Sequence, residues 1–186
     1  MKNRLKPASS AFAVLIFAMG LGGCLGIPDN LKPVEDFELD RYLGTWYEIA
    51  RLDHSFERGL SNVSAQYSQR DGGVTVVNRG YNVSKGEWKE AVGKAFFIGD
   101  PSIGQLKVSF FGPFYGAYNI VALDQETYQW ALVVGPDTDY LWILARGTKL
   151  EEATKDQILA TASSYGFNTD ELIFVEHDRA DMSLQH

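Results

Sequence analysis

The sequence predicts an all-β fold of eight short antiparallel strands, followed by one helix and a short ninth strand. Its 186 residues are 45% hydrophobic, which suits one domain with a packed core. From residue 42 onward, short runs rich in Val, Ile, Tyr, Phe and Trp are separated by Gly, Pro, Asn and Asp. A stripe of apolar residues at helical spacing follows the last long run. Such a meander either closes into a barrel or folds as a sandwich.

The expected strands take their limits from turn-forming residues. Asp71-Gly72-Gly73 is a tight-turn sequence, and Gly112-Pro113 marks another turn. Between such signals, strands are predicted at residues 44–53, 62–70, 73–82, 91–99, 104–111, 116–123, 128–134 and 140–146.

One helix is expected after the eighth strand. Ile158, Leu159, Ala162 and Tyr165 form a single apolar stripe, and Gly166 is the usual residue type just beyond a helix end. An amphipathic helix in this place should pack its stripe on the outside of the sheet. Residues 172–175 then form the short ninth strand.

The N-terminus has the features of a secretory signal. Three basic residues precede an apolar stretch that is too short to span a bilayer, and small residues lead to Cys24. This pattern resembles a bacterial lipobox, in which the cysteine is acylated. The alternative is an ordinary signal peptide with a coincidental cysteine. The predicted organisation is a signal peptide at 1–23, a lipidated N-terminus and linker at 24–40, a barrel domain at 41–178 and a tail at 179–186.

Charge and cysteine content restrict the possible partners. The net charge is −7, and removal of residues 1–23 with their three basic residues makes it −10. No basic face for nucleic acid is visible, and anionic lipid headgroups would repel the domain. We expect acyl chains on Cys24 to hold it at a membrane, since each buried methylene contributes about 0.8 kcal/mol. Leu25, in place of an aspartate, resembles the sorting signal for the outer membrane.

The first predicted strand contains the most informative motif, Gly44-Thr45-Trp46-Tyr47-Glu48-Ile49-Ala50-Arg51. Strand periodicity places alternate residues on one face. The inward set is expected to be Gly44, Trp46, Glu48 and Ala50. A carboxylate on that face is costly unless it is paired, so Glu48 should meet a tyrosine hydroxyl, a cation or a ligand headgroup.

The G-x-W-Y pattern resembles the first signature of the lipocalin family. Asp137-Thr138-Asp139-Tyr140 is similar to the turn before the eighth lipocalin strand, and Arg146 to the basic residue at its end. The resemblance covers residues 37–176 and is greatest to bacterial lipocalins, which are relatives of apolipoprotein D. It implies an eight-stranded up-and-down barrel whose base is closed by Gly44, Trp46 and Arg146, with the arginine packed across the indole.

The resemblance also implies a function. An eight-stranded barrel can enclose one small molecule, and lipocalins of this type suggest a fatty acid or a lysophospholipid. The expected cavity residues are Glu48, Ala50, Tyr118, Tyr140, Trp142 and Leu144. Two alternatives are an envelope scaffold protein with a filled barrel and an enzyme built on the same cup. An outward aromatic patch around the turn near residues 110–118 would be a candidate for contact with another protomer or with the membrane. The aromatic residues there are Phe110, Phe111, Phe114, Tyr115 and Tyr118. Bacterial relatives also suggest a homodimer, and the barrel is expected to face the periplasm at the outer membrane.

We expect no catalytic residues, no metal and no cofactor. Asp53-His54-Ser55 contains the residue types of a hydrolytic triad, but adjacent residues on an extended chain point apart. His54, His177 and His186 have no metal-ligand spacing. Gly72-Gly73 precedes a predicted strand, whereas a phosphate-binding loop precedes a helix. The residues around His54 are therefore expected to form a loop over the barrel mouth.

Overall fold

The computed structural model describes residues 25–179, so the predicted signal peptide, Cys24 and residues 180–186 lie outside the described part. Its strands form one antiparallel sheet in the order β2-β3-β4-β5-β6-β7-β8-β1-β9, and an additional β1–β2 pairing closes strands β1–β8 into a barrel. This confirms the predicted barrel and rules out the sandwich. The elements are α1 (Leu39–Tyr42), β1 (Gly44–Arg51), β2 (Leu60–Arg70), β3 (Gly73–Asn82), β4 (Glu87–Phe97), β5 (Gln105–Ser109), β6 (Gly116–Leu123), β7 (Trp130–Val134), β8 (Leu141–Ala145), α2 (Glu152–Ser164), η1 (Thr169–Glu171) and β9 (Ile173–Phe174).

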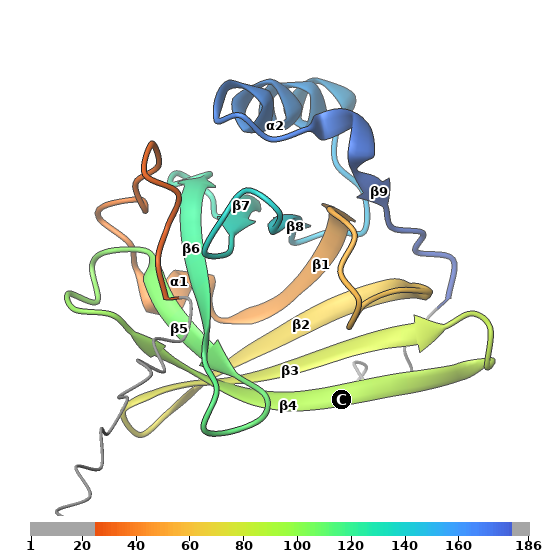
Figure 1. Cartoon of the computed structure of the whole chain (residues 1–186), viewed down its shortest axis with the longest axis horizontal. Helices are drawn as coiled ribbons and strands as arrows, with labels where there is room; N and C mark the ends of the chain where they lie inside the picture. The colour runs from red at the N-terminus through yellow and green to blue at the C-terminus, as the bar shows by residue number, and fades with distance from the viewer. Residues whose placement is uncertain (1–24, 180–186) are drawn as a thin grey trace, which may run out of the picture.

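The barrel wall is taller on one side. Strands β2, β3 and β4 have 11, 10 and 11 residues, whereas β5, β7 and β8 have five each. Strand β4 pairs with β5 only through residues 94–97, so its first half extends beyond the neighbouring strand. Figure 1 shows the β3–β4 hairpin projecting away from the shorter strands.

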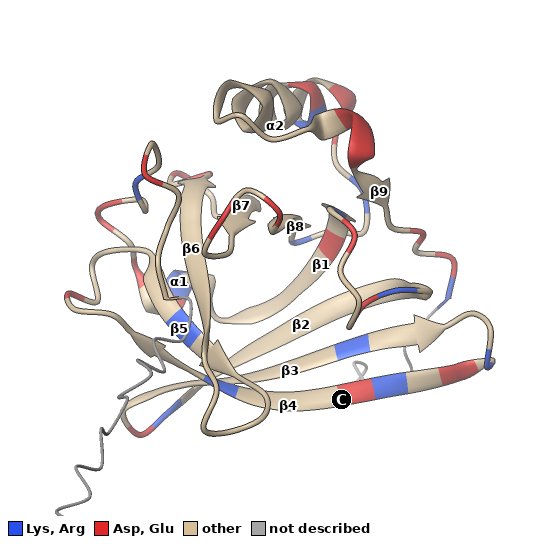
Figure 2. Cartoon of the chain, in the orientation of Figure 1, with Lys and Arg blue, Asp and Glu red and all other residues tan. Residues whose placement is uncertain are grey.

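The connections alternate between the two ends of the barrel, as in any up-and-down meander. The β1–β2, β3–β4, β5–β6 and β7–β8 connections share one end, the mouth. The β2–β3, β4–β5 and β6–β7 connections share the other end with α1, which precedes β1. Figure 2 shows charged residues over α2 and several loops, whereas the β5–β6 loop, residues 110–115, has none.

Two apolar clusters lie on opposite faces of the wall. The inner cluster includes Trp46 and Leu144, and the outer cluster includes Leu132 and Ile143. Alternation along each strand produces this division, because successive side chains point to opposite faces. The barrel therefore has a packed exterior under α2 as well as a lined interior.

Helix α2 covers the outer cluster, as expected from its stripe. Ile158 and Ala162 are fully buried there, and Leu159 and Tyr165 pack at its margin. Gly166 follows the helix with φ of +91°, a conformation that costs glycine little. Between residues 25 and 179, no helix is long and apolar enough to cross a membrane.

The segment expected as a linker is packed against the barrel in its described part. Leu31 and Phe37 are buried, in the outer and inner clusters respectively. Val34 donates its backbone N–H to the carbonyl of Ile120 at 2.8 Å, and Gly104 donates to the carbonyl of Val34 at 2.8 Å. The prolines and charges that suggested a free linker are thus part of a fixed strap that runs from residue 26 to α1.

Candidate functional site: the barrel interior and its mouth

The closed end of the barrel contains Trp46 and Arg146. Trp46 has no exposed surface, and its indole N–H donates to the carbonyl of Tyr42 at 2.7 Å. The guanidinium carbon of Arg146 lies 4.0 Å from the centroid of the Trp46 ring. The same guanidinium donates to three backbone carbonyls, of Tyr128, Thr45 and Arg41. Gly44 lies close by, because a Cβ there would be 3.4 Å from Arg146 Nη1.

Three tyrosines lie near Trp46: Tyr42 and Tyr67 are buried, and Tyr118 is partly buried. The hydroxyl of Tyr118 is 2.7 Å from that of Tyr42 and 2.9 Å from that of Tyr67. Burial is the main cause of raised pKa values for all three phenols, and it raises the pKa of Tyr67 to about 12. The hydroxyls therefore satisfy one another as neutral groups inside an apolar wall. Only Tyr118 of this trio was expected from the sequence.

A bulge in β1 changes which side chains face the interior. Glu48 pairs with Leu144, but Ala50 pairs with Ile143, so the register shifts between Glu48 and Ala50. Ala50 consequently lies in the outer cluster, and its expected place in the cavity is wrong. The bulge also brings Arg51, which strict alternation would place opposite Glu48, to the face of Trp142.

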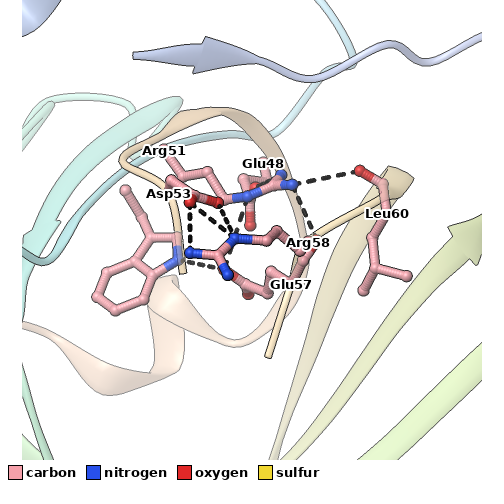
Figure 3. A network of polar contacts seen from close by, with 7 residues as sticks. Glu48, Arg51, Asp53, Glu57, Arg58 and Leu60 are labelled. Atoms are coloured by element: carbon pink, nitrogen blue, oxygen red, sulfur yellow. Dashed lines mark hydrogen bonds and ion pairs between the residues drawn. The ribbon is translucent and has the colours of Figure 1, made fainter. Parts of the chain in front are cut away.

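The result is a buried polar network at the end of β1 that lies nearer the barrel mouth (Figure 3). Arg51 Nη1 donates to Glu48 Oε1 at 2.6 Å, and Arg51 Nη2 donates to the carbonyls of Glu57 and Leu60. Trp142 Nε1 donates to Glu57 Oε2 at 3.0 Å. Arg51 Nε is buried without a hydrogen-bond partner and lies 3.9 Å from Glu57 Oε2.

This network contains two carboxylates and one guanidinium that are buried away from water. Burial, followed by repulsion from Glu57, raises the pKa of Glu48 to about 8 against the opposing effect of Arg51. Burial also raises the pKa of Glu57, despite the hydrogen bond that its carboxylate accepts from Trp142 and the nearby charge of Arg51. The main physical reason is that a buried carboxylate loses its hydration, and one cation can balance only one of the two carboxylates.

The Asp53-His54-Ser55 segment is not arranged as a catalytic triad. The Asp53 carboxylate accepts from Arg58 Nε and forms an exposed ion pair with it. His54 is buried, and its Nε2 has no hydrogen-bond partner. Its ring stacks on Tyr140 at 4.9 Å and on Phe56 at 5.3 Å. Burial, with Arg51 nearby, lowers the pKa of His54 and favours the neutral ring.

Tyr140 lies at the mouth, just before β8 begins, and not on the inward face of that strand as expected. Together with His54 and Arg58, it lines a pocket of about 570 Å³ between the β1–β2 loop, the β7–β8 turn and the chain after α2. Its displacement follows from strand length, because β8 starts at Leu141. Tyr140 thus contacts the mouth loop instead of the barrel wall.

The remaining expected cavity residues belong to the inner cluster. Leu144 is buried, whereas Trp142 and Tyr118 keep part of their surface accessible. Val108 and Phe110 are likewise inward and only partly buried. The interior thus combines an apolar wall with one polar network. No group of three or more potential metal ligands converges within residues 25–179.

Strand periodicity could not identify Arg51 and Glu57 as interior residues. A bulge has no reliable signature in a single sequence, and Glu57 reaches Trp142 from a loop. The only available indication was that Glu48, on an inward face, required a partner.

Comparisons with known proteins agree with this architecture. A family model described as a lipocalin-like domain matches residues 37–177. Outer membrane lipoprotein Blc of Vibrio cholerae serotype O1 is 54% identical over 89% of this chain and 98% of its own. Apolipoprotein D of Rattus norvegicus is 35% identical over 72% and 71% of the two chains. The solved structure of insecticyanin from Manduca sexta has a TM-score of 0.66 at 24% identity, and the match covers 87% and 90% of the chains.

The family model and the relatives cover the whole barrel, from the strap before β1 to the strand after α2. The chain therefore belongs to the lipocalin family.

Proposed function

We propose that this lipocalin binds and carries an elongated apolar molecule, most simply a fatty acid or a lysophospholipid, at the outer membrane. The observation that carries this proposal is that inward side chains of the closed barrel, including Trp142 and Val108, keep accessible surface. A solid barrel core would bury them completely. The headgroup of the lipid would lie near the network of Glu48, Arg51 and Glu57, at the mouth end of the barrel.

The relatives named outer membrane lipoproteins support the location. In this proposal Cys24 carries the acyl chains and the barrel faces the periplasm. No chemistry is required for loading or release, because binding needs only burial of an apolar tail. The expected cavity residues that this proposal retains are Glu48, Tyr118, Trp142 and Leu144, with Tyr140 at the mouth. A homodimer stays a prediction.

Titration of the purified acylated protein with a fluorescent fatty acid and a fluorescent lysophospholipid tests this function. We expect saturable binding of at least one probe and its displacement by the unlabelled lipid. Trp142→Ala should weaken binding, whereas Trp88→Ala, a change on the exposed β4 strand, should not. Absence of saturable binding by both probes would contradict the proposal and favour an envelope scaffold with a filled barrel.

A further inference from the structure

We propose that the β5–β6 loop, residues 110–115, inserts its phenylalanines into the surface of the membrane that carries the acyl chains, so that the barrel mouth faces the bilayer. This inference rests on the proposed acylation of Cys24 and goes beyond lipid carriage itself. It assigns a membrane-contact surface to an element outside the barrel interior.

The loop has an unusual composition for a water-facing segment. Phe111 is 81% exposed and Phe114 is 72% exposed, and the segment Phe110–Tyr115 has no charged residue. Removal of such a side chain from water into an apolar environment is favourable in proportion to the apolar area buried. Two exposed phenylalanines on one loop therefore favour membrane contact without the help of charge attraction.

A second apolar group lies on the β3–β4 hairpin at the same end of the barrel. Val83 and Val92 are about three-fifths exposed, and Trp88 is 38% exposed. Tryptophan is enriched where proteins meet the interfacial region of a bilayer. The hairpin carries Lys85 and Lys89 beside acidic neighbours, so it lacks the strong negative charge of the chain as a whole.

The start of the fixed strap brings the anchor close to this loop. The carbonyl of Gly26 accepts a hydrogen bond of 3.1 Å from Asn119 Nδ2, and Asn119 is fully buried. Cys24 precedes Gly26 by two residues and can lie at most about 7 Å away. Asn119 is three positions along β6 from Gly116, where the loop ends, or roughly 10 Å. The acyl chains thus enter the membrane within about 20 Å of the base of the loop.

The anchor also favours a membrane over a second copy of the chain as the partner. Acylation holds the bilayer beside the loop at every protein concentration, whereas contact between two copies depends on their concentration. The mature charge of −10 gives the domain no electrostatic attraction to an anionic surface, so apolar side chains must provide the contact.

Site-specific labelling of the full acylated protein tests this inference. In that protein the thiol of Cys24 is blocked, so Phe114→Cys provides one free thiol for an environment-sensitive fluorophore. Asp156→Cys, an exposed position of helix α2, is the matched control, because α2 lies on the far side of the barrel from this loop (Figure 1). Both variants are reconstituted into phosphatidylethanolamine and phosphatidylglycerol vesicles that contain lipids brominated on their acyl chains.

We expect the label at position 114 to shift to the blue and to be quenched several-fold more strongly than the label at position 156, independently of protein density. An emission spectrum at position 114 that is typical of a label in water would overturn the inference. So would a blue shift that grows with protein density and is accompanied by crosslinks between the 114 positions of two molecules, because a second copy of the chain would then cover the loop. The mass of the N-terminal peptide reports acylation separately. Unmodified Cys24 would refute the anchor, whereas modified Cys24 with a water-exposed label would refute insertion alone.

Discussion

Arg146 combines two roles that no other basic side chain can fill at the base of the barrel. Its planar guanidinium covers the Trp46 ring and donates to backbone carbonyls from three segments. A lysine would keep the charge but lose the flat surface and the forked donors. The contribution of Arg146 to stability is therefore geometric as well as electrostatic.

We expect Arg146→Lys to reduce the free energy of unfolding by on the order of 3 kcal/mol, because hydrogen bonds and the stacked contact are lost together. Urea denaturation of the purified protein measures this change. Arg58→Lys is the control, since its pair with Asp53 is exposed to solvent and should change the free energy of unfolding little. Equal effects of the two substitutions would show that the contacts of Arg146 add nothing.

Glu48 should make the stability of the barrel depend on pH. Its folded pKa, about 8, lies above the ordinary value of 4.5 because of burial and the nearby Glu57. Between these two values the folded state binds more protons than the unfolded state. Its contribution to stability is thus complete below the ordinary pKa and is lost as the pH rises through the folded pKa.

The free energy of unfolding should therefore fall as the pH rises from the ordinary pKa of Glu48 toward its folded pKa, and Glu48→Gln should flatten this dependence. Urea denaturation at a series of pH values measures it. Asp71→Asn, at an exposed turn, should leave the profile unchanged. A profile that is identical in Glu48→Gln and the unsubstituted protein would show that Glu48 stays ionised in the folded state.

At the scale of elements, periodicity and turn residues locate the strands well. The predicted and observed limits of the third strand agree at both ends, and α2 covers the expected stripe. The bulge in β1 was not predictable, because it depends on how Glu48 and Ala50 pair with β8. That one extra residue moves Ala50 outward and brings Arg51 beside Glu48.

Helix α2 should contribute to stability mainly through its fully buried positions. Ile158→Ala is expected to cost about 3 kcal/mol, since it leaves a cavity in the outer cluster. Leu159→Ala, one position away and only partly buried, should cost clearly less. Thermal and urea unfolding compare the two variants. Similar losses of stability in the two variants would mean that burial of the apolar stripe is not what stabilises the helix on the barrel.

At the scale of the whole molecule, the hollow and the filled barrel differ in how they accept added volume. Val108 lies on the inner wall of β5 and is partly buried, whereas its neighbour Lys107 points outward, with its ammonium over Tyr115. A larger side chain at position 108 therefore enters the interior, and one at position 107 does not.

Val108→Trp should weaken binding of the fluorescent lipid roughly tenfold, equivalent to about 1.4 kcal/mol, with little change in stability. Lys107→Trp should leave binding unchanged. Lipid titration and urea denaturation of both variants provide the measurements. In a filled barrel, Val108→Trp would instead destabilise the fold by about 1–3 kcal/mol through overpacking.

The local features could be predicted from the amino-acid sequence: eight strands, a C-terminal helix, and the motif residues Trp46 and Arg146 at the first and eighth strands. These follow from periodicity and residue type, which act over a few neighbouring positions. Three features required the folded arrangement of the chain: Arg51 meets Glu48 and Glu57, Tyr140 lies at the mouth, and the strap packs on the barrel. Such contacts depend on strand register and on segments far apart in the chain, and one bulge is enough to reverse which side chains face inward.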